Sequence, residues 1–165
     1  MKEQNLNHLE QAIKTQLRLE VLSVPQGLPD KILSQMALQQ KLHRPDVDIK
    51  EASIAGLDFL DELSGYDRTI IIDAIQTGKG KPGKIYRFGP EVLADTRHAA
   101  SPHDVNLATA LELGKRLHLP LPKDITIFAI EAEDVTNFSE DCTPGVALAI
   151  PQCVDLVLKE LNLAS

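Results

Sequence analysis

The chain contains little of what disulfide-stabilised or nucleic-acid-binding proteins need. Its 165 residues include two cysteines, Cys142 and Cys153, which form no CxxC pair. This excludes a disulfide framework and a cysteine-rich metal site, and it indicates a reducing cytoplasm. Tryptophan is absent and aromatic residues make up only 4%, so base-stacking platforms for single-stranded nucleic acid are not expected. With 17 Lys and Arg against 24 Asp and Glu, the net charge of −7 also argues against phosphate binding.

Long hydrophobic runs are missing as well. No apolar stretch approaches the roughly 18 residues that a membrane-spanning helix requires. The first residues, MKEQNLN, lack the charged and then apolar build of a signal peptide. We therefore expect a cytoplasmic protein with no membrane insertion and no nucleic-acid partner.

The composition is that of a folded globular protein, with 43% hydrophobic and 25% charged residues. Its length favours a single domain, since domains typically run to roughly 100–200 residues. Apolar residues at helical spacing predict an amphipathic N-terminal helical extension over residues 1–16. The remainder, residues 17–165, is predicted to be one α/β domain.

Strand patterns and helix patterns alternate along this domain. Strands are predicted at residues 17–24, 47–53, 69–75, 85–88 and 125–130, and helices at residues 30–43, 56–63, 104–117 and 144–161. Such alternation predicts a three-layer α/β/α fold with a mainly parallel central sheet of about five strands. Residues 69–75 are apolar on both faces, as in the centre of a parallel sheet, and residues 85–88 suit an edge. Residues 131–143 are predicted to form an acidic loop.

Two polar residues stand where ligands bind in open α/β sheets, beyond the carboxyl ends of the strands. Asp73 comes late in the most apolar strand, where a carboxylate is costly unless it is hydrogen-bonded, paired or bound to metal. His103 falls in the first turn of a helix that the Ser-Pro-x-Asp pattern at Ser101 predicts. The alternatives are an Asp73 that only accepts backbone N–H bonds and an exposed His103 with no role.

Two further carboxylates belong to the same predicted edge. Asp30 begins a predicted helix, where helix capping is the alternative explanation, and Glu51 comes at the end of the second strand. Together with Asp73 and His103, one such acid would form a small oxygen and nitrogen site. These ligands suit Zn, Ni, Mn or Fe better than Cu(I), and the residues do not select among them.

Three segments together carry a family resemblance: IIIDAI around Asp73, the KPGKI loop at residues 81–85, and SPHDVNLATALEL from Ser101. In this order they resemble the hydrogenase maturation proteases, over most of the chain from Leu17 to its end. Residues 54–60, which include Gly56, are similar to a further glycine-containing segment of the family.

The resemblance implies an endopeptidase that recognises nickel. It would remove the C-terminal extension of a [NiFe] hydrogenase large-subunit precursor after nickel insertion, so the nickel is carried by the substrate and not held tightly by the free protein. Asp73 and His103 would be the catalytic residues and would bind this nickel. Asp30, the residue that we expect as the third ligand, or alternatively Glu51 would supply the remaining carboxylate. Glu51 and Gly56 would contact the substrate.

The first family motif differs in this chain. Its two glycines and one asparagine are replaced by Ser23, Pro25 and Gln26. Without a gap its acidic ligand aligns with Ile32, whereas a short deletion brings Asp30 close to that role. The alternative is therefore a non-catalytic relative that binds a hydrogenase subunit or assembly factor, and an unrelated α/β metallohydrolase is a third hypothesis. The peptide-cleaving group and the oligomeric state stay open.

Overall fold

The computed structural model describes residues 17–22, 46–52, 57–92, 102–133 and 143–162. The predicted N-terminal helix over residues 1–16 and the predicted helix over residues 30–43 lie outside these residues.

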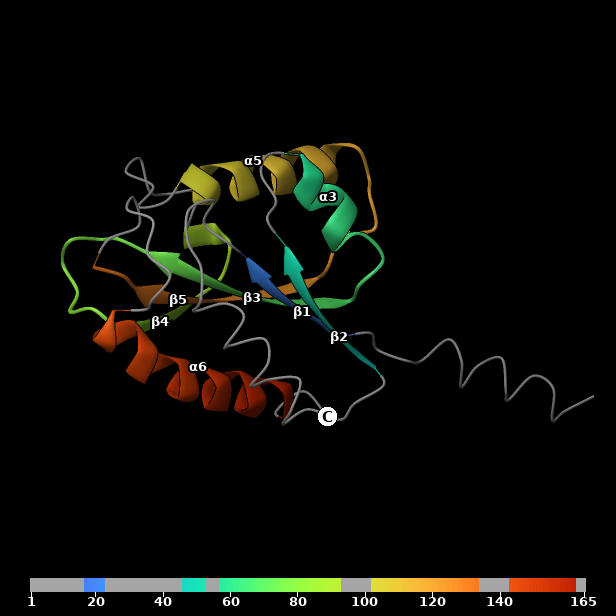
Figure 1. Cartoon of the computed structure of the whole chain (residues 1–165). Coiled ribbons are helices and arrows are strands. Elements are labelled where there is room, and N and C mark those ends of the chain that lie inside the picture. The colour runs from blue at the N-terminus through green and yellow to red at the C-terminus, as the bar shows by residue number, and fades with distance from the viewer. Residues whose placement is uncertain (1–16, 23–45, 53–56, 93–101, 134–142, 163–165) are drawn as a thin grey trace, which may run out of the picture.

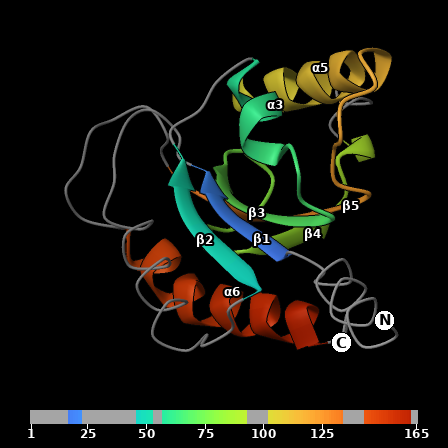
Figure 2. The same cartoon turned by 90° about the vertical axis from the view of Figure 1, so that its right-hand side faces the viewer.

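The described part of the chain forms a layered α/β structure (Figures 1 and 2). The strands are β1 Leu17–Leu22, β2 Val47–Ala52, β3 Arg68–Ile75, β4 Ile85–Phe88 and β5 Asp124–Glu131. The helices are α3 Asp58–Leu63, α5 Pro102–Arg116 and α6 Pro144–Asn162. The predicted α/β class is confirmed.

The strands lie side by side in the order β2-β1-β3-β5-β4. Neighbours pair in parallel from β2 to β5, and β4 pairs antiparallel with β5. The central place predicted for residues 69–75 and the edge place predicted for residues 85–88 are both confirmed. The carboxyl ends of β1, β2, β3 and β5 consequently share one edge of the sheet, called the carboxyl edge below.

The alternating side chains of β3 supply two cores, one on each face of the sheet. Ile70 and Ile72 belong to a cluster with the apolar side of α6, while Ile71 belongs to a cluster with α3 and α5. Successive residues of a strand point to opposite faces, so an uninterrupted isoleucine run fits a strand covered on both sides. Figures 1 and 2 show α6 on one side of the sheet and α3 and α5 on the other.

Two of the differences between the predicted and observed boundaries bear on the candidate site. Helix α5 begins at Pro102, as the capping pattern at Ser101 predicts, and not at residue 104. Proline suits the first helical position, where its missing N–H would have no partner within the helix. Strand β5 continues to Glu131, so the prediction that the acidic loop starts at this residue is wrong. Glu131 is only 2% exposed, because it stays in the ladder between β3 and β4.

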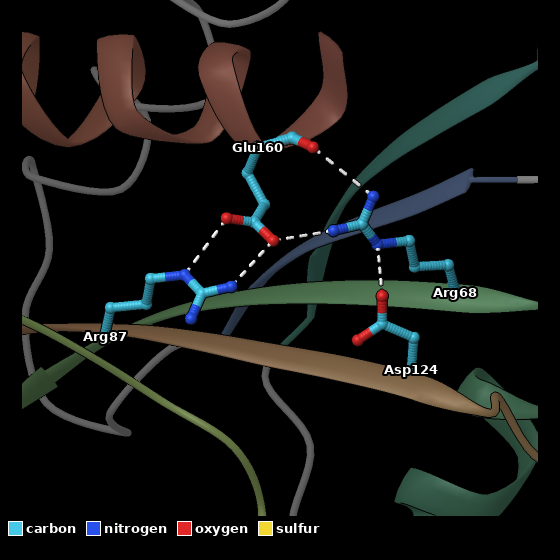
Figure 3. Close-up of polar contacts among 4 residues, drawn as sticks. All are labelled: Arg68, Arg87, Asp124 and Glu160. Carbon is cyan, nitrogen blue, oxygen red and sulfur yellow. Dashed lines mark hydrogen bonds and ion pairs between the residues drawn. The ribbon is translucent and has the colours of Figure 1, made fainter. Parts of the chain in front are cut away.

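An ion-pair cluster ties the end of α6 to the sheet (Figure 3). The Glu160 carboxylate accepts bonds of 3.0 and 2.8 Å from the Arg87 guanidinium and one of 2.7 Å from Arg68. Arg68 Nε also lies 2.7 Å from Asp124 Oδ2, its neighbour in register at the start of β5. Hydrogen bonds from Arg87 and the positive charge nearby lower the pKa of Glu160 against the opposing effect of burial. Since Arg68 and Asp124 begin their strands, the cluster anchors the sheet at the end opposite its carboxyl edge.

Within the described residues, no helix is both long and apolar enough to cross a membrane.

Candidate active-site edge

Asp73 lies near the carboxyl end of β3, the central strand of the sheet. Its side chain is half-buried, and its Oδ1 accepts a 2.8 Å hydrogen bond from the backbone N–H of Ala74. It occupies the same face as Ile71, two residues earlier, and therefore faces the layer of α3 and α5. The sheet thus presents this carboxylate at the predicted edge and on one defined side.

The register of the strands places the backbone of Glu51 near the level of Asp73 in the sheet. Glu51 pairs with Val21 of β1, and Val21 pairs with Ile72, the residue before Asp73. Neighbouring strands are about 4.8 Å apart, so two strand spacings place these backbone positions roughly 10 Å from each other. Their shared edge agrees with the arrangement expected for a parallel sheet.

Helix α5 brings the backbone of His103 to the same end of the sheet. In Figure 1 the helix starts above the arrowhead of β3 and runs back toward the beginning of β5. Leu107, four residues after His103, is 3% exposed and belongs to the cluster that contains Ile71. Residues four apart occupy one stripe of a helix, so His103 lies one turn beyond the buried contact, toward the carboxyl edge.

The remaining predicted site residues are described only in part or not at all. Asp30 and Gly56 lie outside the described residues, as do the side chains of Glu51 and His103. Among the side chains that the structure describes, no three His, Cys, Asp or Glu residues gather closely enough to hold a metal ion. Of the predicted site residues, the structure therefore describes Asp73 in full and only the backbone of Glu51 and His103.

A second carboxylate, Glu131, organises the loop that follows β3. Its two oxygens accept hydrogen bonds from the Thr77 N–H at 2.8 Å, the Thr77 hydroxyl at 2.8 and 3.0 Å, the Gly78 N–H at 3.2 Å and the Tyr86 hydroxyl at 3.0 Å. Burial raises the pKa of this carboxyl, but the hydrogen bonds from Thr77, Tyr86 and Gly78 together outweigh burial and lower it. Glu131 is accordingly a charged group saturated with donors.

The same loop, residues 76–84, has backbone anchors as well. The Gly83 N–H donates to the Glu131 carbonyl at 2.8 Å, and the Glu131 N–H donates to the Lys84 carbonyl at 2.8 Å. Gly83 has a φ of +87°, and a side chain there would collide with the backbone of Gly145 at the start of α6. A side chain at Gly80 would meet the Tyr86 hydroxyl and the Glu131 carboxylate. The loop is therefore fixed by both β5 and α6.

The two carboxylates at this edge differ in exposure. Asp73 is half-buried, while Glu131 is buried and holds the adjoining loop. Glu131 was not singled out from the sequence, where it appears as one acid among several after an apolar strand. The threonine and glycine of the loop give no sign of pairing with a residue more than 50 positions away.

Comparisons with known proteins agree with this architecture. Residues 33–160 match the family model described as hydrogenase maturation protease. The hydrogenase 2 maturation protease of Escherichia coli is 32% identical over 128 residues, covering 76% of this chain and 77% of that protein.

Two solved structures from E. coli share the fold. A hydrogenase-maturating endopeptidase superposes with a TM-score of 0.74 at 24% identity, covering 90% of this chain and 93% of the other. A protein described as an endopeptidase superposes with a TM-score of 0.73 at 27% identity, covering 90% and 94%.

Proposed function

The chain belongs to the hydrogenase maturation protease family, and from this premise we propose that it cleaves the nickel-loaded precursor of a [NiFe] hydrogenase large subunit. It is an endopeptidase, as the members of this family are. The bond that it cuts is the one preceding the C-terminal extension of the precursor. The reaction takes place in the cytoplasm, and residues 17–165 act as one α/β domain behind an N-terminal helical extension.

Asp73 is the residue on which this proposal chiefly depends. It is a half-buried carboxylate at the carboxyl edge of the central strand, where α/β proteins bind their ligands. In the proposed reaction Asp73 and His103 bind the nickel that the precursor brings. The bound ion positions the scissile segment and polarises its carbonyl group as a Lewis acid.

A third ligand completes this set. Asp30 supplies it in our proposal, and Glu51 and Gly56 contact the substrate chain beside it. The register of β2 and β1 supports the place of Glu51, because it puts that backbone position at the same edge as Asp73.

The test incubates the protein with nickel-loaded large-subunit precursor and follows the precursor mass by mass spectrometry. We expect the wild-type protein to release a C-terminal peptide and Asp73→Asn to lose at least about 100-fold in rate, since an amide binds a metal ion poorly in place of a carboxylate. Asp67→Asn is the matched control, because Asp67 is an exposed acid just before the other end of β3. It should cleave at the wild-type rate.

Intact precursor that binds the wild-type protein but is never shortened would contradict the endopeptidase proposal. That result would instead favour the non-catalytic assembly factor. Equal rates for the Asp73 and Asp67 variants would remove Asp73 from the site.

A further inference from the structure

The loop formed by residues 76–84 carries a concentrated positive charge in an acidic protein. Lys79, Lys81 and Lys84 are all exposed, and the loop contains no Asp or Glu, whereas the whole chain has a net charge of −7. Within the described residues, no ion pair involves any of these lysines. The Lys84 ammonium group lies 4.7 Å from the centre of the Tyr86 ring.

These lysines belong to a loop whose backbone is held by three contacts with β5 and α6. The Glu131 carboxylate holds Thr77 and Gly78 at one end of the loop. Backbone bonds to Glu131 hold the other end, and Gly83 lies directly against Gly145 of α6. A charged group on a pre-organised support loses less conformational entropy on binding than one on a free loop.

The place of the loop relates it to the proposed reaction. It begins three residues after Asp73 and leaves the sheet at the carboxyl edge. A polypeptide that extends from a scissile bond near Asp73 would reach the loop within a few residues, since an extended chain spans roughly 3.3 Å per residue. The lysines therefore lie within reach of the substrate segment and outside the reacting centre.

We propose that this lysine loop docks the precursor by binding carboxylate groups of its C-terminal segment. This inference rests on the proposed function and adds the substrate chemistry that the enzyme recognises. Lysine ammonium groups pair with carboxylates as point charges, which steers association and sets orientation more than it accelerates the chemical step. The carboxylates come either from acidic side chains or from the C-terminus of the precursor.

The double charge reversal Lys79→Glu/Lys81→Glu tests the proposal. Both side chains are exposed, so the fold should survive, and the melting temperature checks this. We expect roughly tenfold weaker precursor binding and a matching rise in KM, with kcat within about twofold of wild type, because steering charges act on encounter. Wild-type binding should also weaken as salt rises, while the variant should show a flatter salt dependence.

Lys115→Glu/Lys123→Glu is the matched control. It makes the same change in net charge at exposed positions at the end of α5 and before β5, away from the carboxyl edge. Its binding constant should stay near the wild-type value.

Two altered precursors identify the carboxylates that the loop binds. One has Asn and Gln in place of the acids of its extension, and the other has an amidated C-terminus. The altered precursor that lacks the contacting carboxylates should bind the wild-type protein as weakly as the loop variant binds native precursor.

The outcomes separate the two proposals. Unchanged binding and KM in the loop variant would overturn the docking role even when wild type cleaves normally. Weaker binding of the loop variant without cleavage by wild type would retain the docking surface and reject the endopeptidase. A loss shared equally by both double variants would show an effect of net charge alone and would also overturn the proposal.

Discussion

Two carboxylates at the carboxyl edge differ in their surroundings, and this difference fits a supporting role for Glu131 and the role proposed for Asp73. Glu131 is 2% exposed and receives hydrogen bonds from backbone and side-chain donors of Thr77, Gly78 and Tyr86. Asp73 is half-exposed, with one oxygen bonded to the Ala74 N–H. Hydrogen bonds donated to a buried carboxylate stabilise its charged form.

Replacing Glu131 with glutamine should destabilise the protein at neutral pH by about 1–3 kcal/mol. The NH2 group of glutamine is a donor and cannot accept hydrogen bonds from the N–H and O–H groups that now donate to the carboxylate. Because the pKa of Glu131 is lowered in the folded state, its stabilisation is present above the unfolded-state pKa of about 4.3 and is lost as pH falls through the folded value. Urea unfolding between pH 2 and 7 should therefore show a shallower acid loss in Glu131→Gln. Exposed Glu133→Gln is the control, and identical pH curves for wild type and Glu131→Gln would refute this role.

At the level of elements, the joint between the loop of residues 76–84 and α6 depends on two glycines in contact. Gly83 approaches Gly145 so closely that a methyl group on either would meet the other backbone or its neighbours. Gly65 offers a comparison, since its φ of +84° resembles the +87° of Gly83 but nothing lies within 4 Å of its missing side chain.

Gly83→Ala should consequently lower the free energy of unfolding more than Gly65→Ala does. In both variants the left-handed backbone strains the new alanine by about 1–2 kcal/mol, and only in Gly83→Ala does the methyl group also collide with α6. Thermal and urea denaturation should give a larger loss for Gly83→Ala by at least about 1 kcal/mol. Equal losses in the two variants would mean that the loop and α6 do not support each other.

Much of the fold follows from local patterns that the sequence displays. The isoleucine run before Asp73 predicts a central parallel strand, and Pro102 with its neighbours predicts the start of α5. The site was predicted less completely. The strand-and-helix pattern predicts that Asp73 and His103 share one edge of the sheet. It does not indicate that Glu131 remains in β5 and holds a loop more than 40 residues before it. Such pairing depends on the β4 and β5 ladder, which is a non-local feature.

For the whole molecule, one sheet separates two independent cores. Ile71 packs with α3 and α5, and Ile150 of α6 packs on the opposite face. Among the described residues none belongs to both clusters, so changes in one cluster should have little effect on the energy of the other.

Ile71→Val and Ile150→Val should each lower the free energy of unfolding by about 0.5–1.5 kcal/mol, the cost of one buried methyl group and the space that it leaves. In the double variant the two losses should add within about 0.5 kcal/mol, as expected for sites without shared partners. Urea unfolding of the four proteins provides the measurement. A coupling above 1 kcal/mol would show that the sheet transmits packing changes between its faces.

The sequence by itself determined the α/β class, the central and edge places of two strands, and the family to which the chain belongs, because hydrophobic periodicity and short motifs are local. It also made Asp73 a candidate site residue, since a carboxylate in an apolar strand is unusual and can be recognised without a structure. Only the tertiary structure decided that Glu131 is buried, that it holds the lysine loop, and that Arg68, Arg87 and Glu160 close the opposite end of the sheet. These contacts join residues that are distant along the chain, and their energies depend on burial and on the donors that folding brings together.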